Sequence, residues 1–541
     1  MKGKTILESW KEISVYLKRS VRTCRRWERG FGLPVHRFGD AAQGHVFAET
    51  DELDAWLKGK LRLAEAGTGP PSLIRSIAVL PIENLSGDGE NDYFAEGLTE
   101  VLITEMGQVG EIRVISHQSV KQFKDSKKPI REIAGLLNVE ALVEGALLQT
   151  KGKVRLSMNM IGATPERHIW AKLFECDPSE AAALPRLISH AAMHQAGVAL
   201  TPRLEARLSD RKAPNAEAYE AYLRGRASVR KSFLFADIQK ALAYFDQAIA
   251  LDPGFAPAHA ERAWAFSQLG TFCHLPPKEA FPVQREAARR AVELDPALAD
   301  GYAALGHAST VYDWDWRRAD ELFVRALDLN PNSQRVLFYY SQHLIWMNRA
   351  EEAIAMHHRL VALDPLNTES RWNEGWAFFW ARRYDEASKV FISLLEQTPE
   401  DHWLEMALGL TCLHQGLSDE AARLCERAGV GVPMGIDRQF DCFVACVFAA
   451  TGREARAREI LGHLKRTEAE RVIDHTQIAL IHCALGEKEE ALERFEQAYR
   501  EKSPLMAYVN IAPFWKPLGG DPRFRDILRR MAFPNPPLAL Q

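Results

Sequence analysis

Four arginines within the segment VRTCRRWERG have the side-chain type and the spacing best suited to binding an anionic partner. At about 100° per residue of an α-helix, Arg22, Arg26 and Arg29 fall on one face. Arg25 lies beside that face and Thr23 at its margin. A guanidinium fork matches guanine edges and phosphate oxygens, and an α-helix fits the major groove of DNA. The spacing therefore predicts a helix that contacts duplex DNA, with a solvated charged face as the plainer alternative.

The uncharged side of this helix must hold it in place. Val21, Cys24 and Trp27 recur every three residues and are expected to face a core. Ser20 is a suitable N-cap, and Gly30 is suited to end the helix. These positions predict a short helix whose arginines turn outward together.

The rest of the first sixty residues supplies a small scaffold. SWKEISVYLKRS predicts a preceding helix with Trp10, Ile13 and Leu17 on one face. Apolar residues within 35–38 and 46–47, around a Gly-containing turn, predict a hairpin, and DELDAWLKGK predicts a third helix. Helix, turn, helix, hairpin and helix is the layout of a winged helix-turn-helix domain.

The string SWKEISVYLKRSVRTCRRWERGFGLPVHR resembles the MerR and excisionase-like winged helix-turn-helix families over about residues 5 to 60. The resemblance implies that Arg22, Thr23 and Arg26 contact bases or adjacent phosphates, and that the wing lies near the minor groove or the backbone. We therefore expect a DNA-binding domain at residues 1–62, whose contact residues are Arg22, Thr23, Arg25, Arg26, Arg29, Arg37, Gln43 and His45.

The charge distribution agrees with a basic head on an acidic body. Residues 1–60 contain 12 Lys and Arg against 8 Asp and Glu, whereas the whole chain of 541 residues has a net charge of -4. This asymmetry favours a nucleic-acid module attached to another part, with double-stranded DNA as its partner.

A Gly- and Pro-containing linker at 63–75 precedes a segment in which apolar strands alternate with amphipathic helices. This alternation predicts a small α/β domain at 76–200. IAVLPIENLSGDG and LNVEALVEGALL resemble the TolB amino-terminal-like domain, which occurs in bacterial cyclases and regulators beside tetratricopeptide repeats. Neither a Walker loop nor a Rossmann glycine motif is present, so the NLSGDG loop is interpreted as a turn. Ligand sensing without catalysis and an enzymatic site remain the alternatives for this domain.

A period of 34 residues dominates the second half of the chain. Alanines recur at this step, as do prolines at 331, 365, 399 and 433; the alanines are Ala319, Ala353, Ala387, Ala421 and Ala455. Thirty-four residues is the period of tetratricopeptide repeats, in which a small residue lets two antiparallel helices approach closely. The spacing predicts an α-solenoid of about eight repeats plus a cap at 212–535.

Such an array stacks into a superhelix whose first helices line a concave surface, where a peptide or partner helix generally binds. With Ala387 as the small residue of its repeat, Trp372 and Trp376 would face this groove. Aromatic residues at helical spacing are more often core, so core packing is the alternative for each. The predicted groove residues are Arg335, Phe338, Gln342, Trp372, Trp376 and Met406.

The composition, 47% hydrophobic and 26% charged, is that of an ordinary soluble protein, with no apolar run long enough to span a membrane. We expect a cytoplasmic chain. The eight cysteines form no C-x-x-C pair and are interpreted as buried thiols, although Cys442 and Cys446 are one turn apart and could share a metal. No paired nucleophile and base, metal cluster or phosphate loop is evident, so neither an enzyme nor a cofactor is expected.

Together these patterns predict a multidomain, mainly α protein: a winged helix-turn-helix, an α/β middle domain and a tetratricopeptide solenoid. The leading hypothesis is a cytosolic DNA-binding transcriptional regulator whose solenoid binds a protein or peptide. Because a single small head makes few contacts, specific binding would require a homodimer or a second DNA-bound protein. The alternative is a tetratricopeptide scaffold or assembly protein with no DNA-binding role.

Overall fold

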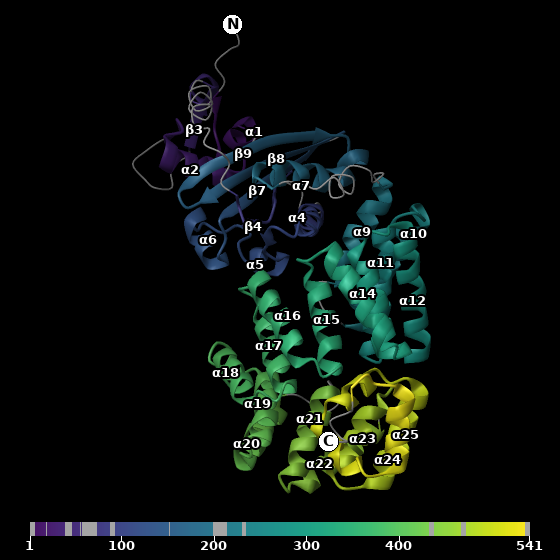
Figure 1. The fold of residues 1–541 in the computed structure, drawn as a ribbon. Coiled ribbons are helices and arrows are strands. Elements are labelled where there is room, and N and C mark those ends of the chain that lie inside the picture. Colours follow the sequence, from purple (N-terminus) through teal and green to yellow (C-terminus); the bar gives the residue numbers. More distant parts are fainter. Residues whose placement is uncertain are drawn as a thin grey trace. The chain divides into compact units, whose positions relative to one another are not determined.

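The computed structural model describes residues 6–17, 19–37, 46–54, 56, 73–86, 92–150, 152–198, 214–229, 234–431, 438–466 and 472–535. The chain divides into two compact units, Met1–Ala227 and Ser228–Gln541 (Figure 1). Within the described part of the chain, no helix combines the length and apolarity that crossing a bilayer requires.

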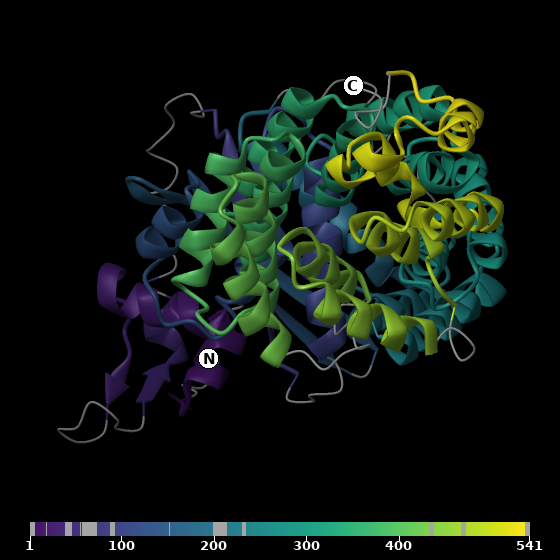
Figure 2. The same cartoon turned by 90° about the horizontal axis from the view of Figure 1, so that it is seen from below.

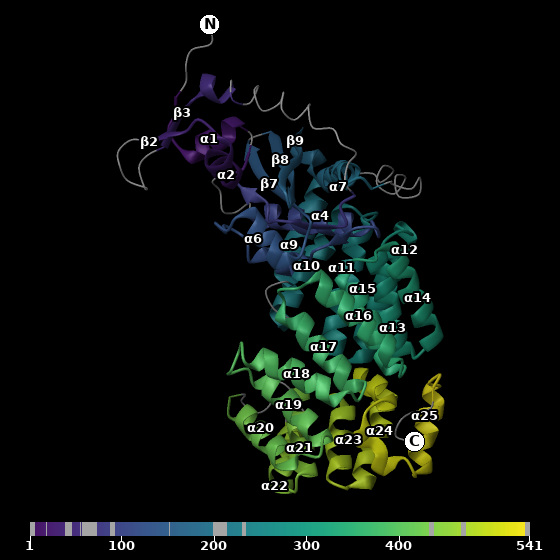
Figure 3. The same ribbon diagram turned by 60° about the vertical axis from the view of Figure 1, so that its left-hand side comes forward.

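The head of the first unit is built from short elements around one apolar core. They are β1 (Ile6–Leu7), α1 (Trp10–Leu17), α2 (Val21–Phe31), β2 (His36–Arg37) and β3 (Val46–Glu49) (Figure 3). β3 is the central strand of a small antiparallel sheet in the order β1-β3-β2. Residues 50–54 and 56 are helical, as DELDAWLKGK predicted. Ile13, Cys24, Ala48 and Leu53 are completely buried and form the core.

The middle domain follows in the same unit as a sheet with helices. Its elements are β4 (Ser76–Val79), β5 (Glu83–Asn84), α4 (Asp92–Gly107), β6 (Arg113–Val114), α5 (His117–Lys121), α6 (Ile130–Leu137), β7 (Ala141–Thr150), β8 (Lys153–Ala163), β9 (Glu166–Cys176), a 3₁₀ turn (Pro178–Ala183) and α7 (Leu184–Gln195). The strand order is β6-β4-β7-β8-β9, with β5 also paired to β7. β4 runs parallel to β6 and β7, whereas β7, β8 and β9 form an antiparallel meander.

The two faces of this sheet differ in chemistry. Val143 and Met160, paired in register, belong to the apolar core that Leu98 of α4 and Ile188 of α7 complete. Because side chains alternate along a strand, the next residue of β7 points to the opposite face. That residue is Glu144, which is buried and pairs in register with Asn159 of β8. The second face therefore carries buried polar groups.

α9 (Ala216–Val229) packs on α4 of the middle domain through its residues in the first unit. The Tyr93 hydroxyl donates to Glu220 at 2.8 Å, and Arg226 forms an ion pair with Glu100. Leu223 lies so close to Gly97 that a Cβ added there would come within 2.9 Å of the leucine side chain. Gly97 thus permits the close approach of the two helices.

The second unit is an array of tetratricopeptide-type helices, each of which packs on its neighbours in the sequence (Figure 1). Its helices are α10 (Phe235–Leu251), α11 (Ala256–Thr271), α12 (Pro277–Leu294), α13 (Ala299–Ala308), α14 (Trp316–Leu329), α15 (Gln334–Trp346), α16 (Ala350–Leu363), α17 (Thr368–Trp380), α18 (Tyr384–Leu395), α19 (His402–His414), α20 (Ser418–Gly431), α21 (Arg438–Ala450), α22 (Glu454–Arg466), α23 (His475–Ala484) and α24 (Lys488–Glu501). The predicted repeat array is therefore confirmed.

The alanine spacing corresponds to the packing of each pair except in one repeat. Ala319, Ala353, Ala387 and Ala421 are all completely buried. Ala455, in contrast, is exposed, so its predicted place in the series is wrong. Ala457 is the buried alanine of α22, and Leu461, four residues later, is also buried in the core. The physical reason is that α21 begins 36 residues after α19 rather than 34, which moves the packed face by two positions.

The C-terminal segment does more than cap the last repeat. It comprises two 3₁₀ turns, η5 (Pro504–Asn510) and η6 (Pro513–Leu518), and α25 (Pro522–Met531), and is yellow in Figure 2. Phe524 packs on Phe495 of α24, with ring centroids 4.9 Å apart, as a cap would. Tyr508 also packs on Trp346 of α15 and Trp380 of α17, at 5.2 and 5.4 Å. The C-terminal segment thus packs against α15 and α17, the first helices of two repeats in the middle of the solenoid.

Candidate functional site

The N-cap and the buried face of α2 are those that the residue pattern predicts. Ser20 is the N-cap, and its hydroxyl accepts a hydrogen bond from the Thr23 backbone N–H at 3.1 Å. Cys24 and Trp27 are buried in the core of the head, where Trp27 packs on Trp56 with ring centroids 5.3 Å apart. The predicted end of the helix at Gly30 is wrong, because α2 continues to Phe31 and its C-cap is Gly32, whose φ of 68° is the left-handed conformation that glycine adopts without strain.

The charged edge of α2 is not turned outward as expected. Thr23 is completely buried, and its hydroxyl donates to the Glu144 carboxylate in the middle of β7. Arg26, whose side chain is 14% exposed, forms ion pairs with Glu144 at 3.6 Å and with Glu166 of β9 at 3.5 Å. The expectation that the arginines of this face point to solvent together is therefore wrong, because carboxylates of the middle domain surround the helix edge.

Further contacts complete this interface. The Trp27 indole N–H donates to Nε2 of His168 on β9 at 2.8 Å, and Arg22 Nη2 donates to the Lys128 carbonyl at 3.0 Å. Glu83 of β5 accepts a hydrogen bond from the Val21 backbone N–H at the start of α2. We refer to Glu83, Glu144, Glu166 and His168 as the docking face of the middle domain.

The docking face perturbs the groups that meet there. Desolvation, with the Arg26 charge as a second cause, lowers the pKa of His168 to about 4. At neutral pH the imidazole is therefore uncharged and can accept the indole proton. Burial also raises the pKa of Glu83 and lowers that of Arg22. Arginine stays charged in spite of such a shift, so the interface pairs cations with carboxylates.

The remaining predicted DNA contacts have different surroundings. Arg25 is exposed, and its guanidinium lies 5.6 Å from the centre of the Trp10 ring. Arg37 on β2 is half exposed and forms an ion pair with Glu28. The Arg29 side chain, Gln43 and His45 lie outside the described residues.

The predicted groove residues differ in their exposure. Trp372 and Trp376 of α17 are half-buried and in mutual contact, with ring centroids 5.6 Å apart. Phe338 and Gln342 of α15 are also half-buried. Met406 of α19 is completely buried, so its predicted place on the groove surface is wrong. A helical wheel assigns Met406 to the groove face, but the side chain belongs to the buried core of the solenoid.

Arg335 already has partners within the solenoid. It lies 3.2 Å from Glu261 of α11 and 3.9 Å from Asp300 of α13, and its guanidinium stacks over Trp264 at 5.0 Å. The buried Glu261 is the stronger of these partners, because little solvent competes for it. Arg335 therefore links three repeats.

Two aromatic residues that the sequence interpretation missed extend the tryptophan pair. Trp403 of α19 lies 6.5 Å from Trp372, and Phe443 of α21 stacks 5.9 Å from Trp376. Trp403 is half-buried like the two tryptophans of α17. It occupies the start of α19, as Arg335 does in α15, and that shared position is the signal that could have identified it. We refer to Trp372, Trp376 and Trp403 as the tryptophan surface.

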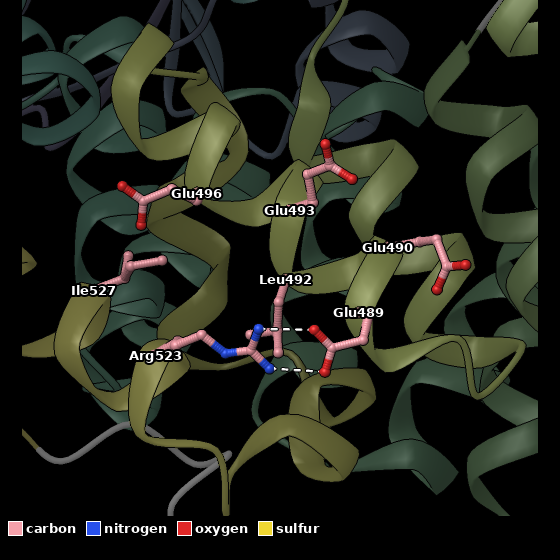
Figure 4. A pocket seen from close by; sticks show the side chains of 7 residues that line it. All are labelled: Glu489, Glu490, Leu492, Glu493, Glu496, Arg523 and Ile527. Carbon is pink, nitrogen blue, oxygen red and sulfur yellow. Dashed lines mark hydrogen bonds and ion pairs between the residues drawn. The ribbon is translucent and has the colours of Figure 1, made fainter.

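A cavity of about 390 Å³ lies between α24 and α25 and is lined mainly by carboxylates (Figure 4). Glu489 and Arg523 face each other there in a two-fold ion pair, at 2.8 and 2.9 Å. Glu496 pairs with Arg530 at 3.0 Å. Arginines of α25 thus neutralise part of this acidic surface, and the pairs hold the terminal helix against α24.

Metal chemistry gains no support from the described residues. Cys442 and Cys446 are buried one turn apart on α21, and the pKa of Cys442 is raised by its hydrogen bond with Cys446 and by burial. Among the residues that the structure describes, no group of three or more His, Cys, Asp or Glu side chains is placed to hold a metal ion.

Comparison with known proteins gives limited matches. No family model matches the chain. A protein of Rhizobium meliloti strain 1021 named "Putative adenylate cyclase 3" is 32% identical over 197 residues, which are 36% of this chain and 33% of that protein. The chain therefore spans about a third of the length of this relative.

Solved structures with a similar fold include tetratricopeptide proteins. YrrB, a tetratricopeptide protein with an unusual peptide-binding site, is 21% identical at a TM-score of 0.26, covering 34% of this chain and 90% of its own. A human IFIT1 dimer with PPP-AAAA is 15% identical at a TM-score of 0.39, covering 59% of this chain and 81% of its own. The repeat array itself is defined by the helix pairs of the second unit and by the 34-residue period.

Proposed function

We propose that the chain is a protein-binding scaffold whose solenoid holds a segment of a partner protein against the tryptophan surface. The observation that supports this function is the clustering of three half-buried indoles on α17 and α19, the first helices of consecutive repeats. Tryptophan and arginine contribute a disproportionate share of binding energy in protein interfaces, and half-buried rings can bury further area without unfolding.

The surroundings of the tryptophan surface favour a protein segment over a small anion. Arg335, the nearby cation predicted for the groove, is already bound to Glu261 and Asp300. Glu369 stands one turn before Trp372 on α17, and burial, with the Asp364 charge as a second cause, raises its pKa. The binding energy would thus come mainly from apolar and aromatic area.

The test compares partners retained by the full chain and by two single variants, Trp372→Ala and Trp403→Ala. Phe272→Ala serves as the control, because Phe272 is 50% exposed and lies on another part of the solenoid. Cross-linking and mass spectrometry should identify a protein that the wild type and the control retain and both tryptophan variants lose. Equal retention by all four chains would exclude the tryptophan surface as the binding site.

We also propose a second function, the binding of duplex DNA by the head. The observation that favours it is the chemistry of α2, which presents guanidiniums, a hydroxyl and a helix N-terminus to anionic oxygens of the docking face. The same groups bind phosphate oxygens in protein–DNA complexes. A regulator of transcription would need two such heads on one operator, for example in a homodimer.

Arg25 offers a test that removes none of the hydrogen bonds or ion pairs described for the docking face, since its exposed side chain lies over Trp10 of the head and acts on Glu83 only through its charge. Affinity for a short labelled duplex should fall as salt rises, and Arg25→Ala should reduce the slope by about one log unit per log unit of salt. Arg317→Ala, which removes an 87% exposed arginine of α14, is the control and should leave the slope unchanged. The same slope for Arg25→Ala as for the wild type would exclude the predicted orientation of α2 on DNA.

A further inference from the structure

The docking face meets the same atoms of α2 that a DNA backbone would require. Glu144 accepts a hydrogen bond from the Thr23 hydroxyl and forms an ion pair with Nη2 of Arg26. The Glu166 carboxylate forms an ion pair with Arg26 Nε at 3.5 Å, without a hydrogen bond, and Glu83 accepts a hydrogen bond from the first backbone N–H of the helix. Three carboxylates thus occupy positions around one helix edge that are suited to anionic oxygens.

Carboxylate and phosphate oxygens compete for these donors because both accept charge-assisted hydrogen bonds of similar geometry. Thr23 is completely buried, and the side chain of its acceptor Glu144 is only 4% exposed. A duplex therefore has no access to Thr23 while the contact is closed. Binding of the docking face and binding of DNA by this helix edge exclude each other.

The position of Glu144 indicates that this face is adapted to a cationic partner. The residue lies midway along β7, between the buried Leu142 and Ala146. An ionised carboxylate in such a place is unfavourable unless it is paired or hydrogen-bonded. Arg26 and Thr23 supply both interactions.

We propose that the docking face of the middle domain is an internal competitor of DNA, which masks the reading edge of α2 until the contact opens. This inference rests on the second proposed function, DNA binding by the head. In the closed state the apparent affinity for duplex DNA is lowered by the fraction of molecules that are open. Any change that separates α2 from β7 and β9 therefore raises the apparent affinity for duplex DNA, although the DNA-contacting residues stay the same.

The experiment alters only the middle domain, so that every atom of the head that could contact DNA stays in place. The full chain and its Glu144→Gln and Glu166→Gln variants are titrated against a short labelled duplex of mixed sequence at low salt. Glu175→Gln is the matched control, because Glu175 lies on the same strand as Glu166 but pairs with Arg155 at 2.9 Å. Hydrogen exchange of the α2 amides reports whether the contact opens, independently of DNA.

We expect Glu144→Gln and Glu166→Gln to bind the duplex about 5- to 150-fold more tightly than the wild type, the usual range of coupling between two sites. Their α2 amides should exchange faster, whereas Glu175→Gln should match the wild type in both measurements. His168→Ala, which removes the acceptor of the Trp27 indole, opens the contact by an independent route if Glu144→Gln does not fold.

The possible failures are distinguishable. Faster exchange with unchanged affinity would overturn masking while leaving DNA binding by the head in place. Unchanged exchange in Glu144→Gln, Glu166→Gln and His168→Ala would show that the docking face does not hold the helix, which also overturns masking. If no variant binds duplex although the exchange rises, DNA binding itself fails, and the competition fails with it.

Discussion

Replacement of Gly375 by alanine tests the link between repeat packing and the tryptophan surface. Gly375 lies on α17 beneath the completely buried ring of Phe391 on α18. An added Cβ would overlap Cε1 of that ring and lie 2.9 Å from its Cζ. Phe391 also contacts Trp372 and Trp376, at 5.5 and 5.8 Å, so its displacement moves the surface proposed to bind the partner.

The expected magnitude follows from the cost of overpacking a core, about 1–3 kcal/mol for an added methyl group that cannot be accommodated. Gly429→Ala is the matched control, because Gly429 lies in α20, is exposed and has no neighbouring atom within 4 Å of an added Cβ. That change should stabilise the helix by about 0.5–1 kcal/mol. The two substitutions are chemically identical and are expected to have opposite signs.

Urea unfolding monitored by tryptophan fluorescence measures both effects in the full chain. Gly375→Ala should unfold at lower urea than the wild type and should bind the partner more weakly, whereas Gly429→Ala should unfold at higher urea. Combining Gly375→Ala with Phe391→Leu should give a loss smaller than the sum of the single losses, since the smaller side chain relieves the overlap. A Gly375→Ala chain at least as stable as Gly429→Ala would refute the close packing of α17 on α18.

Three further predictions concern other parts of the molecule. Burial lowers the pKa of His343 and His357 to about 4, whereas an unfolded histidine has a pKa of about 6.5. Because the unfolded chain then binds protons more readily than the folded chain, the free energy of unfolding is highest above pH 6.5 and decreases as the pH falls toward 4. At about pH 5 the cost is about 2 kcal/mol for each histidine, and urea midpoints that are equal at about pH 7.5 and pH 5 would contradict it. Asn510→Ala should destabilise the second unit by about 1–3 kcal/mol, because Asn510 is completely buried and donates to a backbone carbonyl of α15; an unchanged thermal midpoint would exclude this role. A thiol reagent should label Cys176 and Cys273 before the six buried cysteines, and peptide mapping that finds a buried thiol labelled first would show that the core opens there.

The period of the repeats predicted most of the second unit because each helix packs on helices that are its neighbours in the sequence. Ala353 and Ala387 pack inside helix pairs that are adjacent in sequence, so spacing and position identify them. The same reasoning failed at Ala455, where α21 begins two residues late and shifts the packed face to Ala457. A fixed step cannot detect such a shift, although the apolar series of Ala457 and Leu461 could have revealed it.

The sequence could not predict which surfaces cover one another. A helical wheel places Thr23 and Arg26 on one edge of α2, but it cannot show that this edge meets Glu144, which is 121 residues away from Thr23 in the chain. The tail presented the same difficulty. The sequence predicted only a cap over the last repeat, yet Tyr508 lies against Trp346, and only three-dimensional packing reveals such a return.

Glu144 is the residue that connects the proposed DNA binding by the head with its proposed masking by the middle domain. Its strand neighbours Leu142 and Ala146 are apolar and buried, so a Val or Ile would satisfy the sheet alone, and Thr23 and Arg26 supply the partners that a buried carboxylate requires. The donors that dock, Thr23 and Arg26, are also those that the helical pattern assigns to DNA. Under the proposed competition, these donors have two mutually exclusive acceptors, and the head and the middle domain would act as one regulated unit rather than as two independent modules.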